Sequence, residues 1–129
     1  MLREYNDSDY PTISKWATAQ HFPILPPEYL PQHGLLYSDT AVGFLYMTDS
    51  KISWMEWIIT NPEAPSADRN RALNEIVSGL IDTAQRNGST VIFTSVEHEG
   101  LIGRYEEFGF MKTDRNMTNM ISMMQKGVK

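Results

Sequence analysis

The chain has 129 residues, of which 41% are hydrophobic and 21% are charged, as in one ordinary globular domain. Its formal net charge of -5 argues against a nucleic-acid-binding face as the main function. The absence of cysteine excludes disulfides and thiolate nucleophiles, and no apolar run approaches the roughly 20 residues of a membrane span.

The first part of the chain predicts a strand, a helix and a long connector. Residues 2–5 form the strand candidate. Polar residues and a proline then signal a helix start, and Ile13 and Trp16 fall on one face at helical spacing, which predicts a helix over residues 8–20. Residues 21–27 contain three prolines, which block regular helix, so we expect an ordered connector here.

The middle of the chain predicts an antiparallel meander followed by a long helix. Apolar and aromatic runs separated by short turns predict three strands, at residues 34–39, 41–48 and 52–60. Apolar residues every four positions predict an amphipathic helix over residues 66–86, ended by Asn87-Gly88. Between the third strand and the helix lies a proline-containing corner, residues 61–65, and a strand that turns into a helix N-terminus is a place to hold an anion.

The last part predicts a further strand, a short helix and two closing strands. The β-branched run at residues 90–96 predicts a fully buried strand, which is able to pair in parallel with residues 52–60. A short helix is expected over residues 101–108, followed by closing strands at 110–113 and 119–124. The element order predicts a single α+β domain over residues 1–129, with a mixed, mostly antiparallel central sheet flanked by helices.

Two short motifs stand in the order and spacing of a known family. Residues 104–110 read Arg-Tyr-Glu-Glu-Phe-Gly-Phe, and residues 55–63 read Met-Glu-Trp-Ile-Ile-Thr-Asn-Pro-Glu. The first resembles the signature after the fifth strand of the GNAT superfamily of acyl-CoA-dependent N-acyltransferases, and the second resembles that family's fourth strand and the corner before its CoA loop. The resemblance implies a GNAT-like fold, acetyl-CoA as co-substrate and acetyl transfer to an amine.

The loop that would hold the CoA pyrophosphate departs from the family's pattern. The family places an Arg or Gln and two small residues there, mostly glycines, which let backbone N–H groups approach the phosphates. This chain has Pro65, Asp68 and Asn70 at those positions. Arg69 and Arg71 can offset the charge of Asp68, and Ser66 can cap the helix and donate to a phosphate oxygen.

The resemblance also implies which groups hold the co-substrate. The backbone of Ile58, Ile59 and Thr60 would hold the thioester and the pantetheine. The amide groups of residues 66–71 would hold the pyrophosphate.

Three titratable side chains are candidates for acid–base chemistry. Glu56 lies between apolar neighbours on a strand, where desolvation raises a carboxyl pKa and suits a general base; the alternative is a solvated carboxylate on the same face as Trp54. The resemblance implies that Tyr105 protonates the CoA thiolate; the alternative is a packed helical aromatic. His98 stands where the family often has Asn and is either a second acid–base group or polar surface.

The connector carries the candidate acceptor-binding residues, which are His21, Phe22, Glu28 and Tyr29. The resemblance implies that this segment lines the acceptor pocket, and aromatic and acidic groups suit an amine; the alternative for Phe22 is that it covers the sheet. Methionines at residues 117–124 suggest either core, which is favoured, or a dimer contact. Three histidines without cysteine or ligand-like spacing argue against a metal site.

These observations predict an N-acetyltransferase that transfers an acetyl group from acetyl-CoA to a small-molecule or protein amine by direct attack. The alternative is a GNAT-fold binding or inhibitory module that has lost CoA chemistry. The missing loop glycines favour the module, whereas Glu56 and Tyr105 favour the enzyme. We expect a monomer or homodimer with no metal, nucleic-acid or membrane partner. The N-terminus lacks a signal-peptide pattern, so we expect a cytoplasmic protein.

Overall fold

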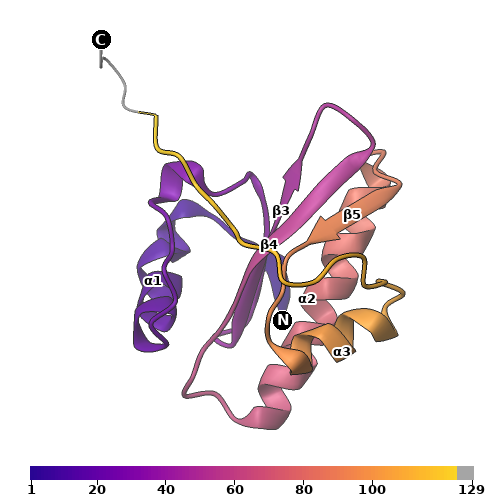
Figure 1. The fold of residues 1–129 in the computed structure, drawn as a ribbon. Helices are drawn as coiled ribbons and strands as arrows, with labels where there is room; N and C mark the ends of the chain where they lie inside the picture. The colour runs from indigo at the N-terminus through magenta and orange to yellow at the C-terminus, as the bar shows by residue number, and fades with distance from the viewer. Residues whose placement is uncertain (125–129) are drawn as a thin grey trace.

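The computed structural model describes residues 1–124 and contains one five-stranded sheet with helices on both faces (Figure 1). The strands are β1 (Leu2–Glu4), β2 (His33–Tyr37), β3 (Ala41–Met47), β4 (Ile52–Thr60) and β5 (Val91–Thr94). The helices are α1 (Tyr10–Ala19), α2 (Ser66–Arg86) and α3 (Glu99–Glu107), with short 3-10 turns at Asp7–Asp9 and Pro27–Tyr29. The predicted α+β class is confirmed.

The strands lie side by side in the order of the chain, β1-β2-β3-β4-β5. The pairs β1–β2, β2–β3 and β3–β4 are antiparallel, and short turns join β2 to β3 and β3 to β4. β5 is parallel to β4, with Ile52 opposite Val91 and Met55 opposite Thr94. The chain reaches this position through α2, since a parallel pair needs a long crossover. The predicted meander and the parallel pairing are therefore confirmed.

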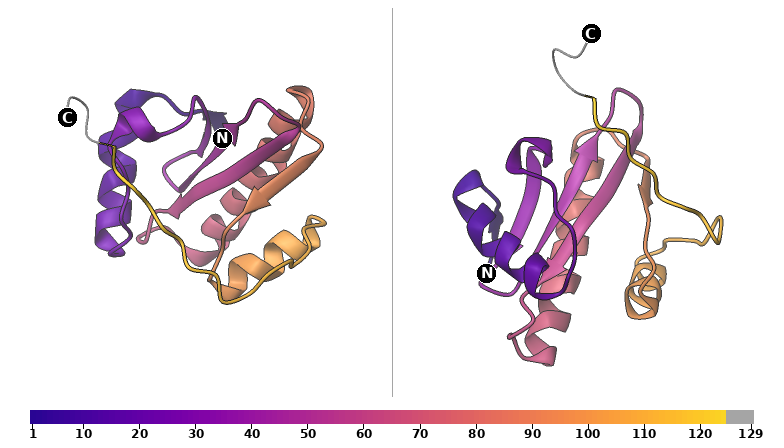
Figure 2. Two further views of the ribbon diagram at one scale, coloured as in Figure 1. Left: turned by 45° about the horizontal axis from the view of Figure 1, so that its top comes forward. Right: turned by 60° about the vertical axis from the view of Figure 1, so that its left-hand side comes forward.

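The sheet separates two apolar cores, and α1 and α2 lie on opposite faces of it (Figure 2). The core under α2 includes the fully buried side chains Leu45, Met55, Ile76 and Leu80. The core under α1 includes Ile13, Trp16, Phe44 and Ile59. Each large apolar side chain buried in this way stabilises the fold by roughly 1.5–3 kcal/mol.

α2 begins and ends at the predicted residues, Ser66 and Arg86. Its buried residues Ala72, Ile76 and Leu80 recur every four positions and form the stripe that faces the sheet. After the helix, Gly88 adopts a φ of 93°, a left-handed conformation that glycine accepts without steric cost. Within residues 1–124, no helix has both the length and the apolar character that crossing a membrane requires.

The two predicted closing strands, at residues 110–113 and 119–124, are wrong. The chain after α3 forms no regular structure up to residue 124, and it runs from α3 across the sheet toward the side of α1 (Figures 1 and 2). Five of the residues at 110–124 are Met, and only Phe110, Thr113, Thr118 and Ile121 are of the β-branched and aromatic types that favour strands. In addition, β5 offers only four residues as a pairing partner.

Two burial predictions are also corrected. The strand at residues 90–96 is shorter, and it is not fully buried, because Val91 and Phe93 are 43% and 44% exposed. The physical reason is that β5 is an edge strand, and its outward residues lie on the face that α2 does not cover. The favoured core placement of the methionines is wrong as well. Met117, Met120, Met123 and Met124 are all exposed.

Candidate functional site

The site is built at the place where β5 stops pairing with β4. Their parallel pairing ends at Met55 and Thr94, where the Thr94 Oγ1 donates a hydrogen bond of 2.8 Å to the Met55 carbonyl. Beyond Thr94 the chain leaves the sheet and continues into α3. Among residues 1–124, residues 56–60 of β4 therefore have no paired strand on the side of β5, and we call this unpaired edge the β4–β5 opening.

A β-bulge in β4 shapes this opening. Val42 lies opposite Ile59, whereas Phe44 lies opposite Glu56, so β4 carries one extra residue opposite Gly43. Trp57 takes up the extra length with a φ of 58°. As a result Glu56 and Trp57 both project to the α1 face, while Ile58 packs in the α2 core.

The sequence analysis did not identify the bulge, although Gly43 is the signal that marks it. A Cβ at Gly43 would lie 2.6 Å from Ile76 Cγ2 and 2.7 Å from Ile58 Cδ1. The strand opposite the bulge therefore needs glycine, because α2 and the bulged strand approach its backbone closely.

Glu56 is a half-buried carboxylate held by its own strand. The Trp54 indole Nε1 donates a hydrogen bond of 3.1 Å to Glu56 Oε2, which confirms that these two side chains share a face. Burial raises the pKa of Glu56, while the N–H donors of Trp54 and of the Trp57 backbone oppose this shift. A carboxylate with a raised pKa and a fixed orientation is suited to accept a proton near neutral pH.

Tyr105 on α3 is buried in the core under α2. Its side chain is 3% exposed and packs against Phe110, with ring centroids 5.4 Å apart. Burial raises the pKa of the Tyr105 hydroxyl above its ordinary range, and the charge of Glu56 raises it further. The phenol is therefore protonated at neutral pH. Its hydroxyl senses the charge of Glu56, although Glu56 projects to the α1 face of the sheet and Tyr105 packs in the core under α2.

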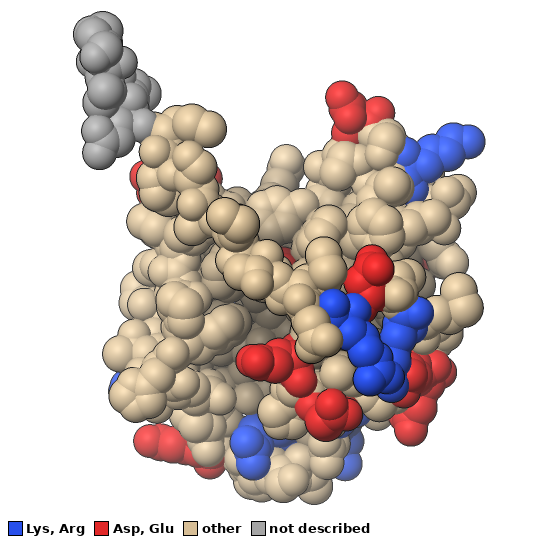
Figure 3. Space-filling view, viewed as in Figure 1, with Lys and Arg blue, Asp and Glu red and all other residues tan. Residues whose placement is uncertain are grey.

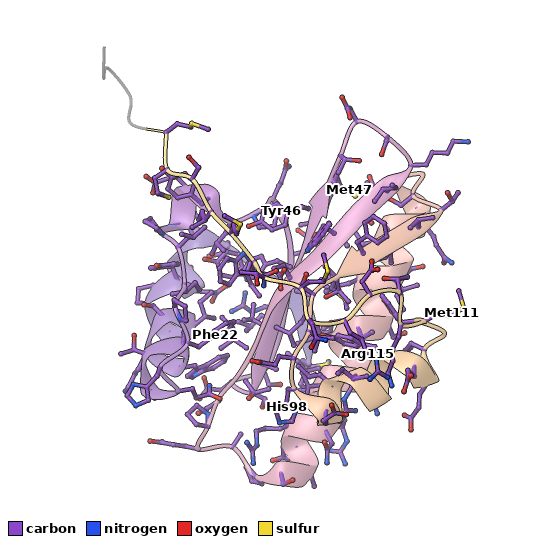
Figure 4. The ribbon with its side chains drawn as sticks, in the orientation of Figure 1. Phe22, Tyr46, Met47, His98, Met111 and Arg115 are labelled. Atoms are coloured by element: carbon purple, nitrogen blue, oxygen red, sulfur yellow. The ribbon has the colours of Figure 1, made fainter. Side chains whose placement is uncertain are left out.

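His98 has a structural role at the start of α3 (Figure 4). It is the N-cap residue, and its Nδ1 accepts a hydrogen bond of 3.1 Å from the Gly100 backbone N–H. One ring nitrogen is thus used by the cap, and the exposed ring keeps Nε2 for other contacts. Among residues 1–124, no group of three or more His, Asp or Glu side chains is arranged to hold a metal ion.

The N-terminus of α2 has no side-chain cap. Pro65 is the N-cap residue and cannot offer a side-chain acceptor, and the first helical hydrogen bond runs from the Arg69 N–H to the Pro65 carbonyl. The predicted capping role of Ser66 is wrong, because Ser66 is the first helical residue. The backbone N–H groups of residues 66–68 thus precede the helical hydrogen bonds and are free to bind an anion.

The charged side chains around this helix end are partly engaged with one another. The Asp68 carboxylate lies 3.9 Å from the Arg71 guanidinium, and both are largely exposed. Arg69 is half-buried, and its Nε has no hydrogen-bond partner within residues 1–124. Asp68 places a negative charge in the first turn of α2, which favours the helix dipole but repels a phosphate.

A contact that the sequence did not reveal ties α3 to this helix end. Arg104 donates hydrogen bonds of 2.8 Å to Asn70 Oδ1 and 2.6 Å to Asn74 Oδ1. Asn70 therefore acts as an acceptor for Arg104. The contact holds the helix that carries Tyr105 against the first turns of α2.

The other predicted co-substrate residues, Ile58, Ile59 and Thr60, are held in the fold by contacts of their own. Ile59 is buried in the core under α1, and Ile58 packs against the core under α2. The Thr60 carbonyl accepts a hydrogen bond of 2.8 Å from Gln20 Nε2. The side chains of Ile58 and Ile59 thus hold β4 in place, and the Thr60 carbonyl is already engaged by Gln20.

The connector brings two of its four predicted residues to the site. Phe22 packs against Trp57, with ring centroids 5.9 Å apart. Trp57 Nε1 donates to the Tyr46 hydroxyl (2.8 Å), which in turn donates to the Tyr29 carbonyl (2.9 Å). These contacts place Phe22 beside Trp57 of β4, and the Tyr29 carbonyl beside Tyr46 of β3.

The remaining two connector residues lie elsewhere. His21 is exposed just after α1. Glu28 lines a separate shallow hollow of about 470 Å³ together with Tyr5 and Asp7. Across the face seen in Figure 3, charged side chains gather over α3, and the middle of the molecule is mostly uncharged.

Comparisons with known proteins identify the fold. No family model and no curated protein matches the sequence. Among solved structures, the chain is similar to an acetyltransferase from Trypanosoma brucei (TM-score 0.69, 12% identity, 94% of this chain and 99% of that chain). It is also similar to the ribosomal-protein-S18-alanine N-acetyltransferase from Escherichia coli (TM-score 0.68, 17% identity, 88% and 79%).

A further similar structure is an N-acetylglutamate synthase from Neisseria gonorrhoeae complexed with coenzyme A and L-arginine (TM-score 0.70, 15% identity, 93% of this chain and 29% of that chain). At such identities the likeness shows the fold. The predicted GNAT-like fold is therefore confirmed.

Proposed function

From the GNAT fold of this chain, we propose that it is an N-acetyltransferase that transfers an acetyl group from acetyl-CoA to an amine. The observation that supports the proposal is a half-buried carboxylate, Glu56, held by Trp54 where the β4–β5 pairing ends, with the buried Tyr105 hydroxyl within reach of its charge. Burial raises the pKa of both groups, and the charge of Glu56 acts on the Tyr105 hydroxyl. In the proposal, Glu56 is the base and Tyr105 is the acid that acyl transfer to an amine requires.

In the proposed reaction, Glu56 takes the proton of the bound ammonium, directly or through water. The amine nitrogen then attacks the thioester carbon, and a C–N bond forms as the carbonyl oxygen becomes an oxyanion. When the C–S bond breaks, the leaving thiolate takes the proton of Tyr105. As the amide forms, the nitrogen gives its second proton to solvent. Solvent in turn returns a proton to the Tyr105 phenolate.

The pyrophosphate would bind at the start of α2. The N–H groups of residues 66–68, the dipole of α2 and the side chains of Arg69 and Arg71 favour an anion at this place. Asp68 opposes it, and no glycine allows the backbone a closer approach. The residues present therefore fit a phosphate in part, and we expect weaker binding than a glycine-lined loop would give.

The second candidate function is a GNAT-fold binding or inhibitory module without CoA chemistry. Two observations favour it: the negative charge of Asp68 in the first turn of α2, and the use of Asn70 as a partner of Arg104. If the chain is the enzyme, a change of Tyr105 slows acetyl transfer. If the chain is the module, no acetyl transfer takes place for Tyr105 to affect.

The test is an assay of thiol release from acetyl-CoA with amine acceptors. We expect Tyr105→Phe to slow turnover about 10²-fold or more while its affinity for acetyl-CoA stays close to that of the wild type. Tyr10→Phe is the matched control, because Tyr10 lies on α1 and donates to the Leu25 carbonyl away from the opening. An unchanged rate in Tyr105→Phe would remove this residue from the mechanism, and an inactive wild type would favour the module.

A further inference from the structure

An aromatic surface lies beside Glu56 on the α1 face of the sheet. Tyr46, Trp54 and Phe93 are successive cross-strand neighbours on β3, β4 and β5, and we call them the aromatic floor. Trp54 and Phe93 meet edge to face, with ring centroids 5.5 Å apart and an interplanar angle of 72°. They are 38% and 44% exposed, so a large part of the floor faces solvent.

The floor is joined to the candidate base. Trp54 Nε1 donates to Glu56 Oε2, which fixes the carboxylate at the end of the floor and leaves acceptor capacity on Glu56 for a ligand. At the other strand, the Tyr46 hydroxyl accepts from Trp57 and donates to the Tyr29 carbonyl, so its ring position is fixed as well. The structure thus combines a held carboxylate with an exposed, oriented aromatic surface.

We propose that the acceptor is a primary arylalkylamine, whose ring lies on the aromatic floor and whose ammonium group binds Glu56. This inference rests on the proposed function, because it names the amine that would be acetylated. Such an amine is complementary to the site at both of its ends, because its ammonium group pairs with a carboxylate and its aromatic ring stacks on exposed aromatic rings. The same rings also attract the ammonium through their faces.

The test compares two amines of similar size and equal charge, 2-phenylethylamine and n-hexylamine, titrated calorimetrically into the full chain without acetyl-CoA. We expect the aromatic amine to bind about fivefold more tightly. Trp54→Ala and Phe93→Ala should each abolish this preference, whereas Glu56→Gln should weaken both amines. Leu2→Ala is the control, because Leu2 is 36% exposed on β1 at the opposite edge of the sheet.

Equal affinities of the two amines, or a preference that survives in Trp54→Ala, would overturn the inference. Circular dichroism checks that each variant is folded, and Trp54→Phe keeps an aromatic ring and should retain part of the preference. A dimer in sedimentation that Phe93→Ala dissociates would instead assign the floor to a second copy of the chain and also overturn the inference.

Its failure is distinguishable from that of the proposed function. If acetyl-CoA does not bind but the aromatic preference is present, the acetyltransferase proposal fails and the amine site stands. If Tyr105→Phe slows turnover but the two amines bind equally, the enzyme stands and the aromatic acceptor fails.

Discussion

In the proposed reaction, Glu56 and Tyr105 take opposite roles, one as proton acceptor and the other as proton donor. Burial raises the pKa of the carboxyl, which makes its conjugate base a better proton acceptor. Burial and the charge of Glu56 raise the pKa of the phenol, which keeps it protonated at neutral pH but also makes it a weaker proton donor. The indole of Trp54 holds the carboxylate in place, so that orientation and proton affinity are both set by the strand.

The pH dependence of turnover follows from the state of Glu56. Only the carboxylate accepts a proton, so the rate is expected to rise with pH through the raised pKa of Glu56, above the range of an ordinary glutamate. Glu56→Gln should remove this limb and slow turnover about 10²–10⁴-fold. Initial rates from mildly acidic to mildly alkaline pH measure both effects, with exposed Glu75→Gln on α2 as the control. An acid limb that persists in Glu56→Gln would contradict the assignment.

A change of Asp68 should improve function rather than impair it, because removal of its charge should strengthen the binding of acetyl-CoA. Asp68→Asn takes a negative charge from the first turn of α2, and we expect acetyl-CoA to bind about two- to fivefold more tightly at low salt. The matched control is Asp82→Asn, since Asp82 is also exposed on α2 and paired with an arginine, but lies near the other end. Equal affinity of Asp68→Asn and the wild type would place the phosphates elsewhere.

At the scale of elements, β4 and α2 could be predicted to the residue. α2 carries an apolar residue every four positions and ends before Asn87-Gly88, and β4 lies between a polar turn and a proline-containing corner. The bulge in β4 could not be predicted, because it depends on the approach of β3 and α2 to the same backbone. The contact of Arg104 with α2 likewise depends on tertiary packing and has no local pattern.

The bulge makes Gly43 a sensitive position. Gly43→Ala would place a Cβ against Ile76 and Ile58, and we expect it to destabilise the fold by about 1–3 kcal/mol. Gly103→Ala is the matched control, since a Cβ at that position of α3 meets nothing within 4 Å. This control should be neutral or stabilising by up to about 1 kcal/mol. Urea unfolding measures both variants, and equal stability of the two would contradict the close approach at the bulge.

At the scale of the whole molecule, the strands of the sheet and the buried residues of both cores all lie in the part of the chain up to the end of α3. Phe110 is the last residue with a clear packing role, because it contacts Tyr105. Beyond it, residues 111–124 are exposed. The apolar residues in this segment predicted closing strands, but a pattern of methionines is compatible with any extended backbone and does not specify a pairing partner.

The exposed segment gives a prediction about stability. A chain that ends at Thr113 should keep the melting temperature of the full chain to within about 2 °C, since residues 114–124, the described part of what is removed, are exposed. Phe110→Ala is the contrasting variant and should melt several degrees lower, because it removes the contact with Tyr105. Circular dichroism melts measure both. A large loss of stability in the shortened chain would show that the segment packs on the domain.

The most direct test of the central claim is a calorimetric titration of the full chain with acetyl-CoA. We predict saturable binding of acetyl-CoA with one site per chain. The binding should be weaker at high salt, because the phosphates bind at the start of α2, and stronger in Asp68→Asn. No detectable binding at high micromolar acetyl-CoA would contradict it and leave the GNAT fold here without its co-substrate.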